Sequence, residues 1–263
     1  MRSIGIKAGS SVFRDEACYS EVAGMLALLT ESYERIFFVV SALEGETDRT
    51  IDSIAADFAK RLKADSDVLR AELDNALRGN PTPYDGEFNT TDVASRLVTP
   101  EGNSVRNIAS ELESLGVSVA TMEHGPNYPL VGLNNGQYLY ATPDLIASHS
   151  VAYDSQVVVV PGFGVRSSDG EVMCTGRGSS DLTLVQIAQV YGLPEIVYWK
   201  GKDAGGFWRT PGTAADGILE TMTRDEARAR SDEKVLDSRV YDFRGDIRIT
   251  LPGRCDGGTL ILK

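Results

Sequence analysis

Cysteine and histidine are scarce in this chain of 263 residues, which contains three of the first and two of the second. Cys18, Cys174 and Cys255 have no close pair and no metal-ligand spacing, so we expect reduced thiols that pack against neighbouring side chains. His124 and His149 fall in no recognisable motif and are expected to be ordinary surface or loop residues. The sequence therefore disfavours a disulfide scaffold and a metal site built from these residue types.

Positive charge is also in the minority, with 26 lysines and arginines against 38 acidic residues and a net charge of -12. Nucleic acid or an anionic membrane would be repelled at long range, so neither is expected as a partner. No apolar run approaches the length needed to span a bilayer, and no signal-peptide pattern precedes the first predicted strand. We expect a cytoplasmic protein.

Apolar runs and amphipathic stretches alternate along the chain. This alternation predicts an α/β fold, a three-layer αβα sandwich with a mainly parallel open sheet and ligands at the carboxyl ends of the strands. The glycine- and proline-containing stretch 79–84 is expected to be a loop between helices. The expected strands are 3–6, 36–40, 117–120, 157–160, 196–198 and 247–251, and the expected helices are 20–34, 51–62, 68–77, 104–115, 182–191 and 225–230.

The most informative segment is Gly176-Arg177-Gly178-Ser179-Ser180-Asp181, which follows the apolar run 157–160 and opens the expected helix at 182–191. Arg177 can fork onto a carboxylate, Asp181 can accept from an ammonium group, and glycine lets a ligand approach the backbone. Such a cavity suits a zwitterion. An ordinary glycine- and serine-rich connection is the alternative for this loop.

Further blocks occur in a fixed order: Ile4-Gly5-Ile6-Lys7-Ala8-Gly9-Ser10-Ser11-Val12, then Val39-Val40-Ser41-Ala42 with Thr47-Asp48, then Glu101-Gly102-Asn103-Ser104, Lys234-Val235-Leu236 and Gly257-Gly258-Thr259-Leu260-Ile261. Together with the loop at 176–181, they resemble the catalytic domain of aspartokinases, members of the amino-acid kinase family. The resemblance covers nearly the whole chain and implies one domain over 1–263. Its substrate-binding part is expected at about 1–155 and its nucleotide-binding part at about 156–263, without the regulatory domains that follow in aspartokinases.

The resemblance implies ATP with Mg2+ and a small amino-acid substrate, and phosphorylation of a side-chain carboxylate, most directly that of L-aspartate. An ionised carboxylate is already a nucleophile, so such an enzyme needs positioning and charge neutralisation rather than a strong base. A Walker A pattern is absent, which fits this chemistry. The implied catalytic residues are Lys7 and Asp181; the implied substrate ligands are Ser41, Thr47, Glu101, Arg177 and Ser180; the implied nucleotide ligands are Gly9, Ser10, Lys200, Lys202, Phe207, Arg209 and Lys234; no metal ligands are implied.

Each assignment has a simpler alternative. Lys7 and Lys234 could be solvated surface lysines, and Ser41 and Thr47 could be turn residues or helix caps. Glu101 could stand in the first turn of a helix and favour its macrodipole, and Asp181 could be an N-cap.

The segment 199–212 departs from the family pattern. Lys200-Gly201 stands where aspartokinases have Ser/Thr-Asp, and Thr210-Pro211-Gly212 replaces their Asp-Pro-Arg. Lys200, Lys202 or Arg209 could substitute as phosphate ligands. The alternatives are a diverged carboxylate kinase that acts on another amino acid and a non-catalytic amino-acid-binding relative. We expect a homodimer and leave open a separate regulatory chain.

Overall fold

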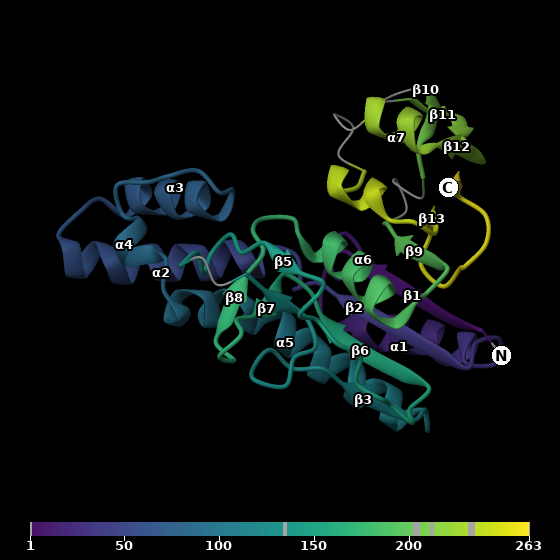
Figure 1. Ribbon diagram of the computed structural model, residues 1–263. Coiled ribbons are helices and arrows are strands. Elements are labelled where there is room, and N and C mark those ends of the chain that lie inside the picture. Colours follow the sequence, from purple (N-terminus) through teal and green to yellow (C-terminus); the bar gives the residue numbers. More distant parts are fainter. Residues whose placement is uncertain (1, 134–135, 202–205, 211–212, 231–234, 263) are drawn as a thin grey trace.

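The computed structural model describes residues 2–133, 136–201, 206–210, 213–230 and 235–262. Its centre is an eight-stranded sheet in the order β12-β14-β13-β9-β1-β2-β6-β3 (Figure 1). Every neighbouring pair in this sheet is parallel except β13 and β14. In chain order the strands of this sheet are β1 Ser3–Ala8, β2 Arg35–Val40, β3 Val119–Thr121, β6 Val157–Pro161, β9 Glu195–Trp199, β12 Thr221–Thr223, β13 Asp246–Thr250 and β14 Thr259–Leu262.

Continuous apolar runs form the middle of the sheet because its strands are covered on both faces. In β2 five of the six residues are buried, and in β6 all five are buried. The expected strands correspond to β1, β2, β3, β6, β9 and β13, which confirms the mainly parallel sheet.

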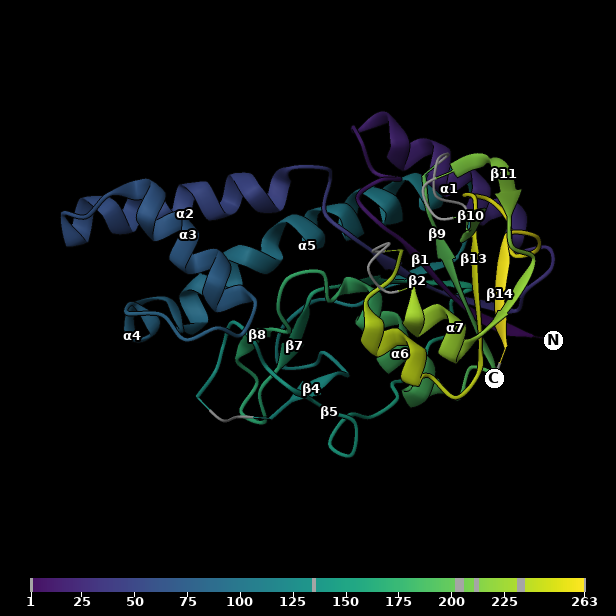
Figure 2. The same cartoon turned by 90° about the horizontal axis from the view of Figure 1, so that it is seen from above.

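Successive residues of each strand point to opposite faces, and each face has its own hydrophobic core. In β2, Phe37 and Val39 pack on the side of α6, whereas Phe38 and Val40 pack on the side of α1 and of the C-terminal half of α5. Figure 2 shows α1 and α6 on opposite sides of the sheet. The three-layer αβα architecture is therefore confirmed. The helices are α1 Ala17–Leu29, α2 Glu46–Leu62, α3 Ser66–Leu77, α4 Asp85–Phe88, α5 Thr91–Ser114, α6 Ser180–Tyr191 and α7 Arg224–Ala229, with a 3-10 turn η2 at Ser238–Asp242.

The helix α5 is longer than the sequence predicted. It begins at Thr91, where the Thr90 side chain accepts from the N–H of Val93 at 3.3 Å, a cap worth about 1 kcal/mol. The expected start near Ser104 was wrong, because the helix continues through Pro100.

The helices α2 and α3 form an arm that extends away from the sheet (Figures 1 and 2). A third hydrophobic core joins these two helices, α4 and the N-terminal half of α5, with Phe58, Leu73, Phe88 and Leu97 at its centre. The stretch 79–84 connects α3 to α4, so the expected loop between helices is confirmed. The chain therefore offers two differently built supports for a site, a buried sheet and a helical arm.

The described residues also form two smaller sheets. One has the order β5-β4-β7-β8 and lies beside α5, and the other pairs β10 with β11. Cys18, Cys174 and Cys255 are free thiols, as expected. Within the part of the chain that the structure describes, no helix has both the length and the apolar character needed to cross a membrane. The additional strands are β4 Val131–Gly132, β5 Pro143–Asp144, β7 Gly164–Arg166, β8 Val172–Cys174, β10 Trp208–Thr210 and β11 Thr213–Ile218.

Candidate active site

A cavity of about 300 Å3 opens at the carboxyl ends of β1, β2, β6 and β9, where α2 and α6 begin. Parallel strands deliver their following loops to one edge of the sheet, so residues far apart in the sequence meet there. The structure brings the following predicted site residues together in its wall: Lys7, Gly9, Ser10, Ser41, Thr47, Glu101, Arg177, Ser180, Asp181 and Lys200.

Two lysines share one carboxylate in the depth of the cavity. Lys7 Nζ lies 2.7 Å from Asp181 Oδ1, and Lys200 Nζ lies 3.5 Å from Asp181 Oδ2. Burial disfavours the ionised form of Asp181, but the charges of Lys7 and Lys200 outweigh it and lower the pKa of this carboxyl. Burial lowers the pKa of Lys200, and Asp181 opposes that shift. With all three ionised, the group carries one net positive charge, which is suited to a phosphate.

These positions rule out the simpler alternatives for Lys7 and Asp181. Lys7 is a residue of β1 and is only 5% exposed, so it is not a solvated surface lysine. Asp181 stands inside the first turn of α6, whose N-cap position is Ser179, so Asp181 is not an N-cap.

Glu101 reaches the cavity from the middle of α5 and accepts a hydrogen bond from Ser180 Oγ at 2.7 Å. Complete burial raises the pKa of Glu101 to about 7, although the Ser180 hydrogen bond and the charge of Lys7 act in the opposite direction. The first-turn interpretation of Glu101 was wrong, since α5 begins ten residues earlier, at Thr91. Gly162 makes the close approach possible, because a Cβ there would lie 2.9 Å from Glu101 Oε2 and 2.7 Å from Ser180 Cβ.

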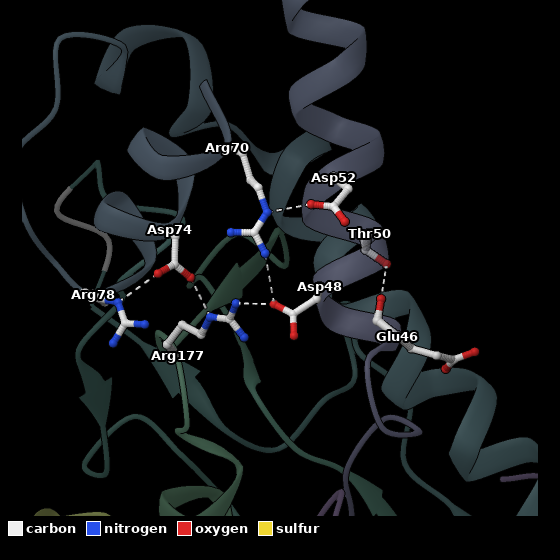
Figure 3. Close-up of polar contacts among 8 residues, drawn as sticks. All are labelled: Glu46, Asp48, Thr50, Asp52, Arg70, Asp74, Arg78 and Arg177. Atoms are coloured by element: carbon white, nitrogen blue, oxygen red, sulfur yellow. Dashed lines mark hydrogen bonds and ion pairs between the residues drawn. The ribbon is translucent and has the colours of Figure 1, made fainter. Parts of the chain in front are cut away.

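Arg177 lies at the junction of the sheet and the arm. Its backbone N–H donates to Leu77 O at 2.8 Å, at the end of α3. Its side chain forms ion pairs with Asp74 of α3, at 2.6 Å, and with Asp48 of α2 (Figure 3). The loop that carries Arg177 is therefore tied to the arm by both backbone and side chain.

The smaller predicted residues occupy the turns around the cavity. Gly9 follows β1, and a Cβ at this position would come within 3.1 Å of Lys7 Nζ. Ser41 directly follows β2 and is buried, and Thr47 is the second residue of α2, whose N-cap is Gly45. The helix-cap interpretation of Thr47 was therefore wrong, which leaves its hydroxyl for other contacts.

Of the remaining predicted nucleotide residues, Phe207 is not in the cavity wall. The Phe207 side chain is fully buried in the core on the α6 side, with the guanidinium of Arg230 over its ring. Arg209 belongs to β10. Lys202 and Lys234 lie outside the described residues. The roles of these four residues stay predictions.

Sequence reasoning missed several contributors to the site, among them Asp48, Asp74 and Phe163. Asp48 was noted only as part of a motif, and Asp74 had no signal because its partner Arg177 is 103 residues away. Phe163 also lines the cavity, with a backbone φ of 65°, a left-handed conformation that is strained for a bulky side chain. No local pattern reports such long-range or backbone features.

Comparison with known proteins places this geometry in context. The model of the amino acid kinase family matches residues 4–238. The bifunctional aspartokinase/homoserine dehydrogenase 2 of Escherichia coli strain K12 is 24% identical over 282 residues, which cover 95% of this chain and 34% of that protein. The chain thus spans about a third of the curated relative that it matches.

Two solved structures show the same fold at low identity. E. coli aspartokinase III in complex with aspartate and ADP superposes with a TM-score of 0.71 and 16% identity, over 98% of this chain and 64% of that one. Uridylate kinase from Archaeoglobus fulgidus gives a TM-score of 0.59 and 13% identity, over 99% of this chain and 100% of that one. Because these two relatives act on different acceptors according to their names, the fold leaves the acceptor to be argued from the site.

Proposed function

Because the chain belongs to the amino acid kinase family, we propose that it uses ATP to phosphorylate the side-chain carboxylate of an amino acid, most directly L-aspartate to 4-phospho-aspartate. One observation carries the proposal. A single cavity holds a guanidinium for a carboxylate, a carboxylate for an ammonium group and a pair of lysines for phosphate, namely Arg177, Glu101 and Lys7 with Lys200.

The substrate end of the cavity suits a zwitterion. Arg177 binds the carboxylate that does not react, and Glu101 accepts from the ammonium group. The hydroxyls of Ser41, Thr47 and Ser180 supply hydrogen bonds that orient the reacting carboxylate. That the relative in E. coli was crystallised with aspartate and ADP supports this substrate class.

The chemistry requires no base, because the acceptor is already ionised. An oxygen of the carboxylate forms a bond to the γ-phosphorus of ATP as the bond to the β,γ-bridging oxygen breaks and ADP leaves. Lys7 and Lys200 neutralise the charge of the moving phosphoryl group, and Asp181 holds both ammonium groups in place. Backbone N–H groups of the turn at Gly9 and Ser10 provide further donors for phosphate oxygens.

A magnesium ion, when bound with ATP, would neutralise part of the phosphate charge. Within the described residues, no three or more histidine, cysteine, aspartate or glutamate side chains form a group that could hold a metal ion. Magnesium binds proteins through one or two carboxylates together with substrate phosphates, so the site fits entry of the ion as MgATP.

A diverged carboxylate kinase for another amino acid is the second candidate. Arg177 already has two carboxylate partners, Asp48 and Asp74, and Lys200-Gly201 replaces the aspartokinase Ser/Thr-Asp. Both features change the groups that an aspartate and a nucleotide would meet. Assembly as a homodimer or with a separate regulatory chain remains part of the proposal.

A hydroxylamine trap tests substrate and chemistry together. The purified protein is incubated with MgATP, hydroxylamine and each standard amino acid, and acyl phosphate is detected as hydroxamate. We expect hydroxamate with L-aspartate or one related amino acid, and none with the Lys7→Met variant or without ATP. Amino-acid binding by calorimetry without hydroxamate from any amino acid would instead identify a non-catalytic relative.

A further inference from the structure

The two acidic partners of Arg177 belong to a string of alternating charges along the arm (Figure 3). It alternates between α2 and α3, passes through Arg177 in the loop that follows β8, and ends at Arg78, the C-cap residue of α3. Its ion pairs are Asp52–Arg70 at 2.6 Å, Arg70–Asp48 at 3.7 Å, Asp48–Arg177, Arg177–Asp74 at 2.6 Å and Asp74–Arg78 at 2.9 Å.

The donors of Arg177 are only partly used by this string. A guanidinium has five N–H donors and can receive a carboxylate along its Nε/Nη2 edge or at its Nη1/Nη2 end. Asp74 Oδ1 accepts a hydrogen bond from Nε, and Asp48 Oδ1 accepts one from Nη2. No described residue accepts from Nη1. A substrate carboxylate can therefore form two hydrogen bonds only at the Nη1/Nη2 end or by replacing one of the two aspartates.

The two aspartates differ in their surroundings. The Asp74 side chain is 19% exposed, does not line the cavity and shares its second oxygen with Arg78. Burial opposes its ionisation, but hydrogen bonds from Arg177 and Arg78 outweigh burial and lower its pKa. The Asp48 side chain is 48% exposed, lines the cavity and has a second cation, Arg70, at 3.7 Å. Asp74 is thus a fixed partner of Arg177, and Asp48 has an alternative.

We infer that Asp48 is an internal competitor for the substrate carboxylate on Arg177, displaced toward Arg70 when substrate binds, and that Asp74 is a positioning residue that fixes the guanidinium. This inference rests on the proposed function. It makes Asp48 a specificity determinant: a ligand takes the place of Asp48 on Nη2 of Arg177 only if its carboxylate binds better than the one already present. Neutral ligands and those without a carboxylate at that place gain nothing from the exchange.

Opposite effects of two isosteric substitutions test the inference. Asp48→Asn should tighten amino-acid binding about fivefold, because the competing charge is gone, whereas Asp74→Asn should weaken it about tenfold, because the guanidinium loses its fixed partner. Both substitutions should change KM and leave kcat nearly unchanged. Asp57→Asn is the matched control, since Asp57 is also an aspartate of α2 paired with an arginine, Arg96, but lies outside the cavity wall.

Further variants separate positioning from folding. The Asp74→Asn effect should disappear in an Arg177→Lys background if Asp74 acts through Arg177. Asp74→Glu, which keeps the charge, should recover part of the lost binding. An equal loss in both backgrounds would assign Asp74 to the stability of the arm and overturn its role.

Calorimetry with L-aspartate and L-glutamate, without ATP, keeps this inference distinct from the proposed function. Tighter binding in Asp48→Asn supports it even if no acyl phosphate is ever formed. Weaker binding in Asp48→Asn would make Asp48 a direct ligand and overturn the competitor role. Absence of binding to either amino acid in the wild type and in all variants would overturn it as well.

Discussion

The cavity has two charged clusters that are built in opposite ways. Lys7, Asp181 and Lys200 stand on or directly beside strands and the first turn of α6, and none of their side chains is more than 14% exposed. Asp48 and Arg177 stand on the arm and a loop, and the Asp48 side chain is 48% exposed. Buried charges on a sheet keep one geometry, because every alternative leaves a charge unpaired. Exposed charges on an arm can change partners at low cost.

The difference indicates that the two clusters suit different steps. The cluster on the sheet suits a step in which donors must already be in place when charge moves. The cluster on the arm suits recognition, which requires that a ligand replace an existing partner. Five experiments test this contrast, from the largest expected effect to the smallest.

Removing the charge of Lys7 should have the largest effect. Lys7→Met keeps the length of the side chain, and Asp181 retains Lys200, so we expect a folded protein. Turnover should fall about 1000-fold, because a preorganised donor to the transferring phosphoryl group is lost. A coupled ADP assay and circular dichroism on the same sample measure both properties. Near-normal turnover would remove Lys7 from the catalytic group.

Glu101 should make the stability of the empty protein depend on pH. Its pKa is raised from 4.5 in the unfolded chain to about 7. Its contribution to stability is therefore complete below pH 4.5 and is lost as the pH rises through 7, by about 3 kcal/mol in total. The difference in unfolding free energy between wild type and Glu101→Gln, from urea titrations at pH 4 to 8, should follow this curve. A difference that stays constant with pH would contradict the pKa shift.

Amino-acid binding, unlike the stability of the empty protein, should become stronger as the pH rises. The ammonium group of the substrate pairs with ionised Glu101, so the amino-acid KM should fall as the pH rises through about 7. In Glu101→Gln this pH dependence should vanish. A pH profile of kcat/KM with saturating MgATP measures it.

Arg177→Lys should damage amino-acid use while nucleotide binding is kept. A lysine keeps the charge but cannot donate two parallel hydrogen bonds to one carboxylate, so kcat/KM for the amino acid should fall about 30-fold. Arg78→Lys is the control, since Arg78 pairs with the same Asp74 but lies outside the cavity wall. Equal losses of kcat/KM in the two variants would show that the loss comes from the ion pairs of the arm and not from the paired donors of Arg177.

The smallest effect is expected for the nucleotide. Lys200→Met should weaken MgADP binding about tenfold, because one charge-assisted contact to phosphate is lost. Lys60→Met, a change on the exposed surface of α2, serves as the control in the same calorimetric titration. Unchanged affinity would leave Lys200 only the role of holding Asp181.

The sequence predicted what depends on local pattern. The expected strands 36–40 and 157–160 were found as β2 and β6, because runs buried on both faces contain only apolar residues. The helix α5 was underestimated because Pro100 lies inside it, and a proline usually ends or kinks a helix.

The sequence predicted some residues of the candidate site and missed others. Residues such as Lys7, Glu101 and Asp181 stand in motifs at strand ends or facing them, so the resemblance to aspartokinases was enough to group them. Asp74 stands in no motif, and only the packing of α3 against the loop that carries Arg177 reveals its contact with that residue. Charge partners of this kind depend on tertiary structure and leave no local trace.

The length of α5 has a mechanical consequence. Its N-terminal half packs in the core of the arm and its C-terminal half on the sheet, with Glu101 between them. A rigid body that rotates moves least near its axis of rotation. Any tilt of the arm about the edge of the sheet would carry Asp48 and Arg70 with it and move Glu101 less, so the proposed contact with an ammonium group would be kept while the proposed contact with a carboxylate changes.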